Sequence, residues 1–114
     1  MLFDDISFHD AQILEVRENA FDQTIDFLLD FPINWEDNKF EKRILRFKNV
    51  VVYIKKEIPF SGYPTIVDVK IKTSSKHSYN DSLVTVATSP YKIEVTTNAG
   101  SRFMEFSDVE LLSP

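Results

Sequence analysis

The adjacent His9 and Asp10 are the one His–Asp pair in the sequence, and together they could do acid–base or metal chemistry. An imidazole and a carboxylate can exchange a proton or bind a divalent metal ion. In a strand, however, adjacent side chains point to opposite faces, so the two groups would not meet. A metal site would also need further His or carboxylate ligands. We therefore expect a structural or helix-capping role here, and we predict no catalytic residue, no metal site and no cofactor.

Asp22, Asp26 and Asp30 recur every fourth residue along the segment 21–31. Four residues of strand span roughly 13 Å, whereas metal–oxygen distances are roughly 2.0–2.6 Å. Neighbours in the series are therefore too far apart to hold one metal ion or to act as an acid–base pair. Two interpretations stay open. The aspartates pair with lysines across a sheet, or they form an acidic stripe that faces a basic protein partner.

Trp35, the only tryptophan, is followed by Glu36 and Asp37 in the polar segment 32–42. Trp35 either caps the open end of the core or is an exposed anchor, since Trp is enriched at binding hot spots. The basic residues of the segment 43–56 are expected to pair with carboxylates across strands. The candidate partner-binding residues are thus Asp22, Asp26, Asp30, Trp35, Glu36 and Asp37.

Composition excludes several classes of function. With two glycines, the chain cannot hold a glycine-rich phosphate loop. With no cysteine, it has no disulfide, thiolate nucleophile or Cys-based zinc site. Eighteen acidic against thirteen basic residues give a net charge of −5, which argues against binding nucleic acid or an anionic membrane surface. The acidic N-terminus does not resemble a signal peptide, and we expect a soluble, cytoplasmic protein.

The segment Tyr91–Phe106 reads as a hairpin around which the domain is built. Apolar residues alternate with polar ones from Tyr91 to Val95, and again at Met104 and Phe106. The sequence Asn98-Ala99-Gly100 predicts a short turn, because Asn and Gly tolerate positive φ. The alternation therefore predicts two paired strands with one buried face.

Further short strands are expected at 11–18, 21–31, 43–47, 50–54, 65–72 and 83–88, with a mobile loop at 73–82. The clearest is 21–31, which collects Ile25, Phe27, Leu29 and Phe31 on one face and ends at Pro32. Val67, Val69 and Ile71 are expected on the buried face of 65–72. The end of the chain adds an edge strand or one helical turn. The fold class is therefore mainly β: a single domain over residues 1–114, built as an antiparallel sandwich or partly open barrel of about six to eight strands.

The motif Phe8-His9-Asp10-Ala11, together with the two hairpins and the Leu45-Arg46-Phe47 strand, carries a family resemblance. The chain resembles a diffuse group of small bacterial β-rich proteins, some of which are immunity proteins of toxin systems. The resemblance implies a non-enzymatic protein that binds and blocks a toxin. Because its motifs are core and turn positions, it carries over no functional residue.

Three hypotheses of function follow. A protein-interaction module predicts a stoichiometric partner and an exposed acidic or aromatic patch, and an acidic patch suits a basic partner. A small-ligand-binding barrel predicts an enclosed apolar pocket lined by Phe and Tyr. An enzyme predicts carboxylates that converge in a cleft. The edge of the expected strand 83–88 could also pair with a second copy, so a homodimer is possible.

Overall fold

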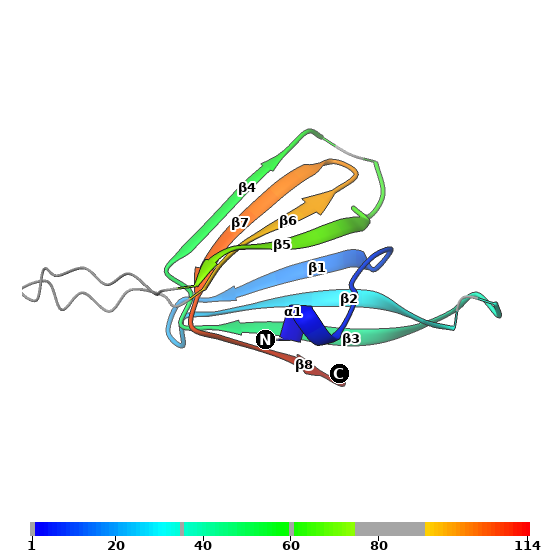
Figure 1. The fold of residues 1–114 in the computed structure, drawn as a ribbon, viewed down its shortest axis with the longest axis horizontal. Coiled ribbons are helices and arrows are strands. Elements are labelled where there is room, and N and C mark those ends of the chain that lie inside the picture. Colours follow the sequence, from blue (N-terminus) through cyan, green and yellow to red (C-terminus); the bar gives the residue numbers. More distant parts are fainter. Residues whose placement is uncertain (1, 35, 60, 75–90) are drawn as a thin grey trace, which may run out of the picture.

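The computed structural model describes residues 2–34, 36–59, 61–74 and 91–114, and most of them lie in eight antiparallel strands (Figure 1). One four-stranded sheet has the order β1-β2-β3-β8 and the other the order β4-β7-β6-β5. The first contains β1 (Gln12–Asn19), β2 (Thr24–Asn34), β3 (Lys39–Lys48) and β8 (Asp108–Leu112). The second contains β4 (Val52–Glu57), β5 (Ile66–Ser74), β6 (Tyr91–Thr97) and β7 (Gly100–Phe106). A short helix α1 (Leu2–Asp5) precedes all eight strands in the chain. The predicted fold class is confirmed.

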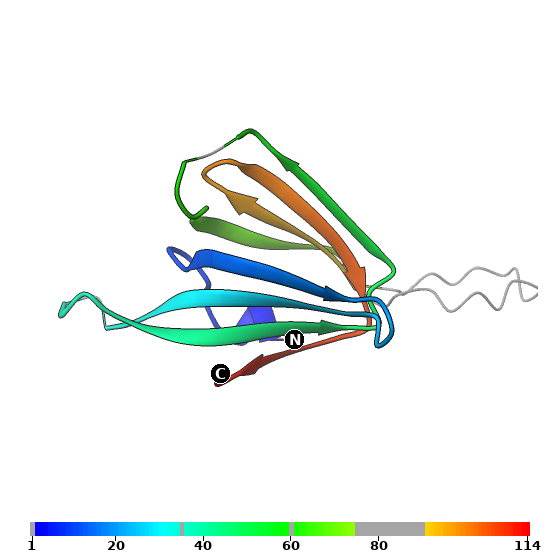
Figure 2. The same ribbon diagram turned by 180° about the vertical axis from the view of Figure 1, so that it is seen from behind.

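The two sheets are joined at both ends. At one corner the chain crosses between them twice, from β3 to β4 and from β7 to β8, and the Ser107 amide donates to the Lys48 carbonyl at 3.1 Å. At the other end β1 meets the start of β5, where the Ile13 amide donates to the Pro64 carbonyl at 2.8 Å. The strands fan out from the first corner, with β4 and β8 at the outer edges (Figures 1 and 2). The result is a partly open barrel.

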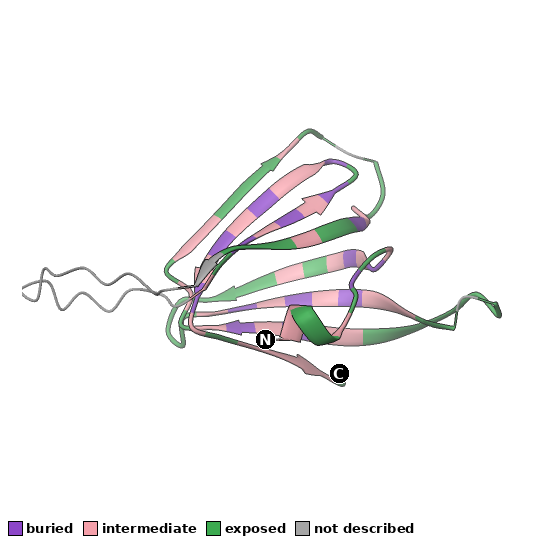
Figure 3. Cartoon of the chain, in the orientation of Figure 1, coloured by how far each residue is buried: buried purple, intermediate pink, exposed green. Residues whose placement is uncertain are grey.

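A cluster of phenylalanine rings fills the space between the sheets. Phe47 contacts Phe27 at 5.5 Å and Phe106 at 4.9 Å between ring centroids, and all three side chains are buried. Phe3 of α1 lies 6.1 Å from Phe47, so the helix covers one side of this cluster. Figure 3 shows the buried residues alternating along the strands, as one-sided burial of a sheet requires.

The hairpin β6–β7 confirms the prediction for Tyr91–Phe106. Its paired residues Ile93 and Met104 are both buried, and Val95 and Phe106 lie on the same face. Asn98 and Ala99 form the turn, and Gly100 has a φ of 150°. The clearest expected strand is also confirmed, since Ile25, Phe27 and Leu29 of β2 are all buried.

Pro32 does not end β2, and of the expected loop 32–42 the residues 32–34 and 39–42 are strand, with a turn at 36–38. β2 continues to Asn34 and pairs with β3, with Pro32 opposite Phe40. The prediction failed because proline is excluded only where both edges of a strand are paired. The pairing of β1 with β2 stops at Gln12 and Asp30, so at Pro32 only the β3 side carries a ladder.

Bulges change the faces of β5. Its register shifts between Ile66 and Asp68, so that Ile66 is buried and Val67 is exposed. The expected alternation of Val67, Val69 and Ile71 on the buried face is therefore wrong at Val67. Ile71 is also exposed. β5 runs to Ser74, two residues into the expected loop, while the remainder of 73–82 and the expected strand 83–88 lie outside the described residues.

Gly100 sits where no side chain fits. A Cβ at this position would lie 2.2 Å from the carbonyl oxygen of Lys56 in β4, and its φ of 150° disfavours other residues. We expect Gly100→Ala to lower the free energy of unfolding by about 2 kcal/mol or more, since backbone must move. Urea unfolding followed by circular dichroism would measure the loss. Asn98→Ala, in the same turn at an exposed position, is the control: it removes the bond that the Asn98 side chain accepts from the Thr65 amide at 3.1 Å but introduces no clash. An equal loss of stability in both variants would contradict the steric explanation.

Candidate functional site

His9 and Asp10 lie in a turn and not in a strand, so the expectation that their side chains point apart is wrong. Asp10 has a φ of 71°, and His9 Nε2 lies 3.5 Å from Asp10 Oδ1. His9 Nδ1 contacts the Val67 carbonyl at 2.8 Å, and the Asp10 amide donates to the Ile66 carbonyl at 2.7 Å. These contacts tie the N-terminal segment to β5. Among the described residues, no three His, Cys, Asp or Glu side chains gather to hold a metal ion.

The three aspartates do not form one stripe. Asp22 precedes β2 and lies in the β1–β2 turn, not on the strand face as expected. Asp26 accepts two hydrogen bonds from Arg46 of β3, at 2.8 and 2.9 Å. These bonds raise the pKa of Arg46 above its usual value. Asp30 faces Lys42 in the register of β2 and β3. Cross-strand pairing with basic residues therefore describes Asp26 and Asp30 better than an open acidic stripe does.

The same turn motif closes the first two hairpins. Asn34 Oδ1 accepts from the amides of Glu36 and Asp37 at 3.0 and 3.2 Å, and Asn34 Nδ2 donates to Asp37 Oδ2 at 3.1 Å. Asn19 makes the equivalent three bonds with Phe21 and Asp22. In each turn the following residue, Gln23 or Asn38, has a φ of 55°. The signal in the sequence is Asn-x-x-Asp followed by Gln or Asn, and it makes Asp22 and Asp37 turn-forming residues.

The far end of the β2–β3 hairpin extends beyond the other strands of its sheet. β1 stops pairing with β2 at Asp30, and β8 stops pairing with β3 at Ile44. The part beyond, residues 31–34 and 36–42, is called here the hairpin arm, and no other strand of the described chain flanks it. Figure 1 shows it extending at the right.

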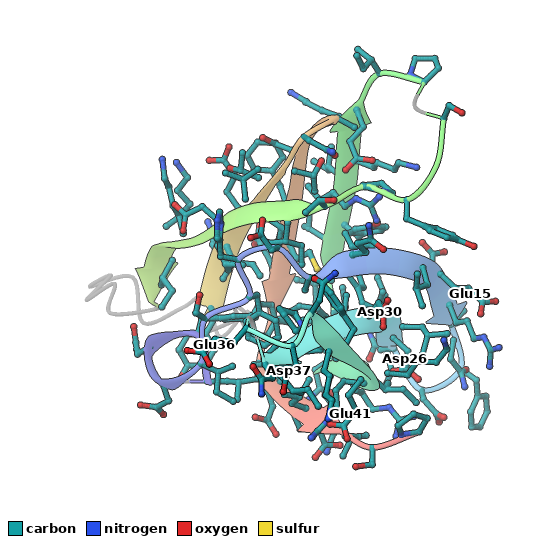
Figure 4. All side chains as sticks on the ribbon, turned by 90° about the vertical axis from the view of Figure 1, so that its right-hand side faces the viewer. Glu15, Asp26, Asp30, Glu36, Asp37 and Glu41 are labelled. Carbon is teal, nitrogen blue, oxygen red and sulfur yellow. The ribbon has the colours of Figure 1, made fainter. Side chains whose placement is uncertain are left out.

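The surface of the arm combines apolar and charged side chains, with two acidic residues at the tip. Ile33 is 53% exposed and Phe40 is 39% exposed. Glu36 and Asp37 are exposed at the tip, whereas further back Lys39 and Lys42 are exposed and Glu41 is paired with Arg43. Figure 4 looks toward the arm and shows Glu36 and Asp37 apart from Asp26 and Asp30, so the predicted residues belong to two places. Trp35 lies outside the described residues.

A buried ion pair, missed from the sequence, lies in the second sheet at the end of β4 that is away from the β3–β4 corner. Arg102 of β7 donates from Nε and Nη2 to the two carboxylate oxygens of Glu57 of β4, at 2.7 and 2.9 Å. Both side chains are 3% exposed. Arg102 Nη1 donates to the Tyr53 hydroxyl at 3.2 Å, and Thr97 Oγ1 donates to Glu57 at 3.0 Å. The ring of Phe27 lies 5.7 Å from the guanidinium carbon.

These polar groups border an open cleft of about 740 Å³. One wall is β1, from Ile13 to Val16, and the other is β4 with the loop 58–64 that leads to β5, of which Phe60 is not described. Ile58 is 69% exposed and Tyr63 is 55% exposed at this loop. The arrangement can bind a ligand with one polar end and an apolar body.

Burial shifts the pKa of the groups in this network. Burial alone would raise the pKa of Glu57, but the hydrogen bonds and charge of Arg102, with the Thr97 hydroxyl, lower it below its usual value. Burial also raises the pKa of Tyr53, which keeps its hydroxyl neutral. The Glu57 carboxylate is therefore the form that the fold stabilises.

The lowered pKa of Glu57 predicts a pH dependence of stability. The stabilisation is complete above the unfolded pKa of about 4.3 and is lost as pH falls through the lower folded pKa, because the unfolded chain takes up the proton first. We expect the difference in free energy of unfolding between the wild type and Glu57→Gln to shrink as pH falls from neutral through this range. Urea unfolding at a series of pH values would measure it. A difference that stays constant with pH would contradict the assignment.

Comparison with protein-family models, with curated proteins and with solved structures finds no match for this chain. No helix among the described residues is long and apolar enough to cross a membrane.

Proposed function

We propose that this chain is a non-catalytic protein-binding module and that the hairpin arm contacts the partner. The observation that carries the proposal is the arm itself: a two-stranded projection flanked by no other strand of the described chain, with Ile33 and Phe40 exposed. Ile33 and Phe40 therefore offer apolar side chains that a partner would cover on docking, and such side chains carry much of the binding energy at interfaces. An isolated two-stranded hairpin is only marginally stable in water, so docking against a partner would also stabilise the arm.

Charge favours a basic partner. The chain carries a net charge of −5, and Glu36 and Asp37 stand at the tip of the arm. Complementary charge accelerates association and selects among partners. The resemblance to immunity proteins adds the kind of partner that we propose, which is a basic toxin that this chain blocks.

The ligand-binding alternative fits the interior less well. It expects an enclosed apolar pocket lined by Phe and Tyr, whereas Phe27, Phe47 and Phe106 are buried against one another in the space between the sheets. The arm therefore supports protein binding better than the barrel interior supports ligand binding.

Affinity capture with the full chain from its native cell, followed by mass spectrometry, would identify the partner. Glu36→Lys is expected to weaken binding of that partner about tenfold, and Phe40→Ala about thirtyfold. Calorimetric titration of the purified pair would measure both. The Glu36 side chain makes no hydrogen bond or ion pair within the described chain, so its replacement leaves the fold unchanged.

Glu18→Lys is the matched control, because it makes the same charge change at an exposed residue at the far end of β1 from the arm (Figure 1). Equal weakening by Glu18→Lys and Glu36→Lys would show a general charge effect and contradict the arm as contact. Capture of no stoichiometric partner would contradict the function itself.

A further inference from the structure

We propose that the cleft between β1, β4 and the loop 58–64 binds a small monocarboxylic acid with an aromatic or branched aliphatic body. This proposal is independent of the hairpin arm, which lies on β2 and β3. It rests on three features of the cleft: unused donors of a buried guanidinium, the sign of the local charge, and apolar side chains at the mouth.

Arg102 has hydrogen-bond donors left over. A guanidinium carries five N–H groups, and the three described bonds go to Glu57 and Tyr53. One N–H on Nη1 and one on Nη2 have no acceptor among the described residues. Buried donors are rarely left without an acceptor, and this side chain is 3% exposed. A carboxylate suits them, since guanidinium groups bind carboxylates through two nitrogens at once.

Glu57 does not block such a ligand. Its oxygens occupy the Nε and Nη2 side of the guanidinium, and Thr97 donates a further bond to it. The ligand carboxylate would approach the remaining N–H groups, next to the Tyr53 hydroxyl, which also lines the cleft. Phe27 lies 5.7 Å from the guanidinium carbon and helps to hold Arg102 in place.

The local charge favours a single negative group. The lining carries two positive charges, on Lys55 and Arg102, and two negative charges, on Glu15 and Glu57. Lys55 Nζ lies 3.9 Å from Glu57, and Glu15 is paired at 3.1 Å with Arg17, which stands outside the lining. With Arg17 counted, three positive charges face two negative ones, so a monoanion restores neutrality and a cation is disfavoured.

The mouth of the cleft offers an apolar surface to the rest of the ligand. Ile58 and Tyr63 stand more than half exposed on the loop, and Ile13 and Val16 of β1 form the opposite wall. Pro59 and Pro64 restrict the backbone of the loop. A volume of about 740 Å³ lies within the range of roughly 300–1,000 Å³ that small-molecule sites show.

Titration of the isotope-labelled full chain with 3-phenylpropanoate, followed by amide and Arg Nε chemical shifts, tests the proposal. We expect saturable shifts at the amides of Lys55–Ile58, Gly62 and Tyr63 and at Arg102 Nε, with a dissociation constant of about 1 mM or tighter. The neutral analogue 3-phenylpropanamide is expected to bind at least about tenfold more weakly, because it lacks the charge. Equal binding of acid and amide, shifts elsewhere, or no saturable shifts would overturn the proposal.

Two variants at exposed residues of the cleft test the site without disturbing the buried Arg102–Glu57 pair on which the fold depends. Lys55→Gln is expected to weaken acid binding about threefold, and Tyr63→Ala about tenfold, through lost charge and lost apolar contact. Phe21→Ala is the matched control, since it removes a 95% exposed aromatic ring in the β1–β2 turn. An equal effect of Tyr63→Ala and Phe21→Ala would overturn the assignment to this cleft.

Discussion

Replacing Glu57 with alanine is expected to lower the free energy of unfolding by about 3–5 kcal/mol. The variant leaves the Arg102 guanidinium buried without the carboxylate that now accepts two of its hydrogen bonds. On the Nε and Nη2 side, which Glu57 occupies, few water molecules can take the place of the carboxylate, since the side chain of Arg102 is 3% exposed. The Thr97 hydroxyl would also lose the carboxylate to which it donates at 3.0 Å. Urea unfolding followed by circular dichroism measures the loss.

Glu94→Ala is the matched control for this prediction. Glu94 is paired with Lys72 at 2.9 Å on the outer face of the same sheet, where ion pairs contribute about 0–1 kcal/mol. The double variant Glu57→Leu/Arg102→Met tests the physical reason, since apolar residues in place of a buried pair cost little. It should therefore be more stable than Glu57→Ala alone. If Glu57→Ala cost no more than Glu94→Ala, the buried pair would not have the role assigned to it.

Alternation in the sequence predicted the elements whose two faces differ clearly. β2 and the β6–β7 hairpin follow it, and Ile25, Phe27 and Met104 are buried as expected. It failed where the environment of a strand changes along its length. Pro32 is tolerated because β1 has already ended beside it, and Val67 is exposed because a bulge adds a residue. Neither the end of a neighbouring strand nor a bulge is visible in a single sequence.

The candidate site was harder to predict because its residues are distant in sequence. Arg102 stands two and four residues before Met104 and Phe106, so alternation already placed its charge on the buried face of β7. A buried arginine requires a partner, but no local pattern points to Glu57. That pairing follows from the register that sets Glu57 opposite Gly100 in the neighbouring strand. The sequence analysis named Glu36 and Asp37 as candidate partner-binding residues because they follow Trp35 in a polar segment. It did not predict the hairpin arm that exposes them.

Replacing Phe47 with alanine is the second large effect that we expect, at about 3–5 kcal/mol of the free energy of unfolding. The Phe47 ring is fully buried and contacts Phe3 of α1, Phe27 of β2 and Phe106 of β7. Its removal would leave a cavity that both sheets and the helix border, so no single element can move in to fill it. Against a total stability of roughly 5–15 kcal/mol for a domain, such a loss would remove a large share of the free energy of unfolding.

Urea unfolding of Phe47→Ala and of the exposed control Phe21→Ala would measure the effect, with about 0.5 kcal/mol or less expected for the control. The two sheets share the Phe47 contact, so circular dichroism and tyrosine fluorescence should report one common transition in the wild type. Separate transitions, or a loss below about 1 kcal/mol for Phe47→Ala, would show that the sheets are stabilised separately. In that case the two walls of the cleft, β1 and β4, would belong to independently folding halves, and the fold would not hold them in one rigid arrangement.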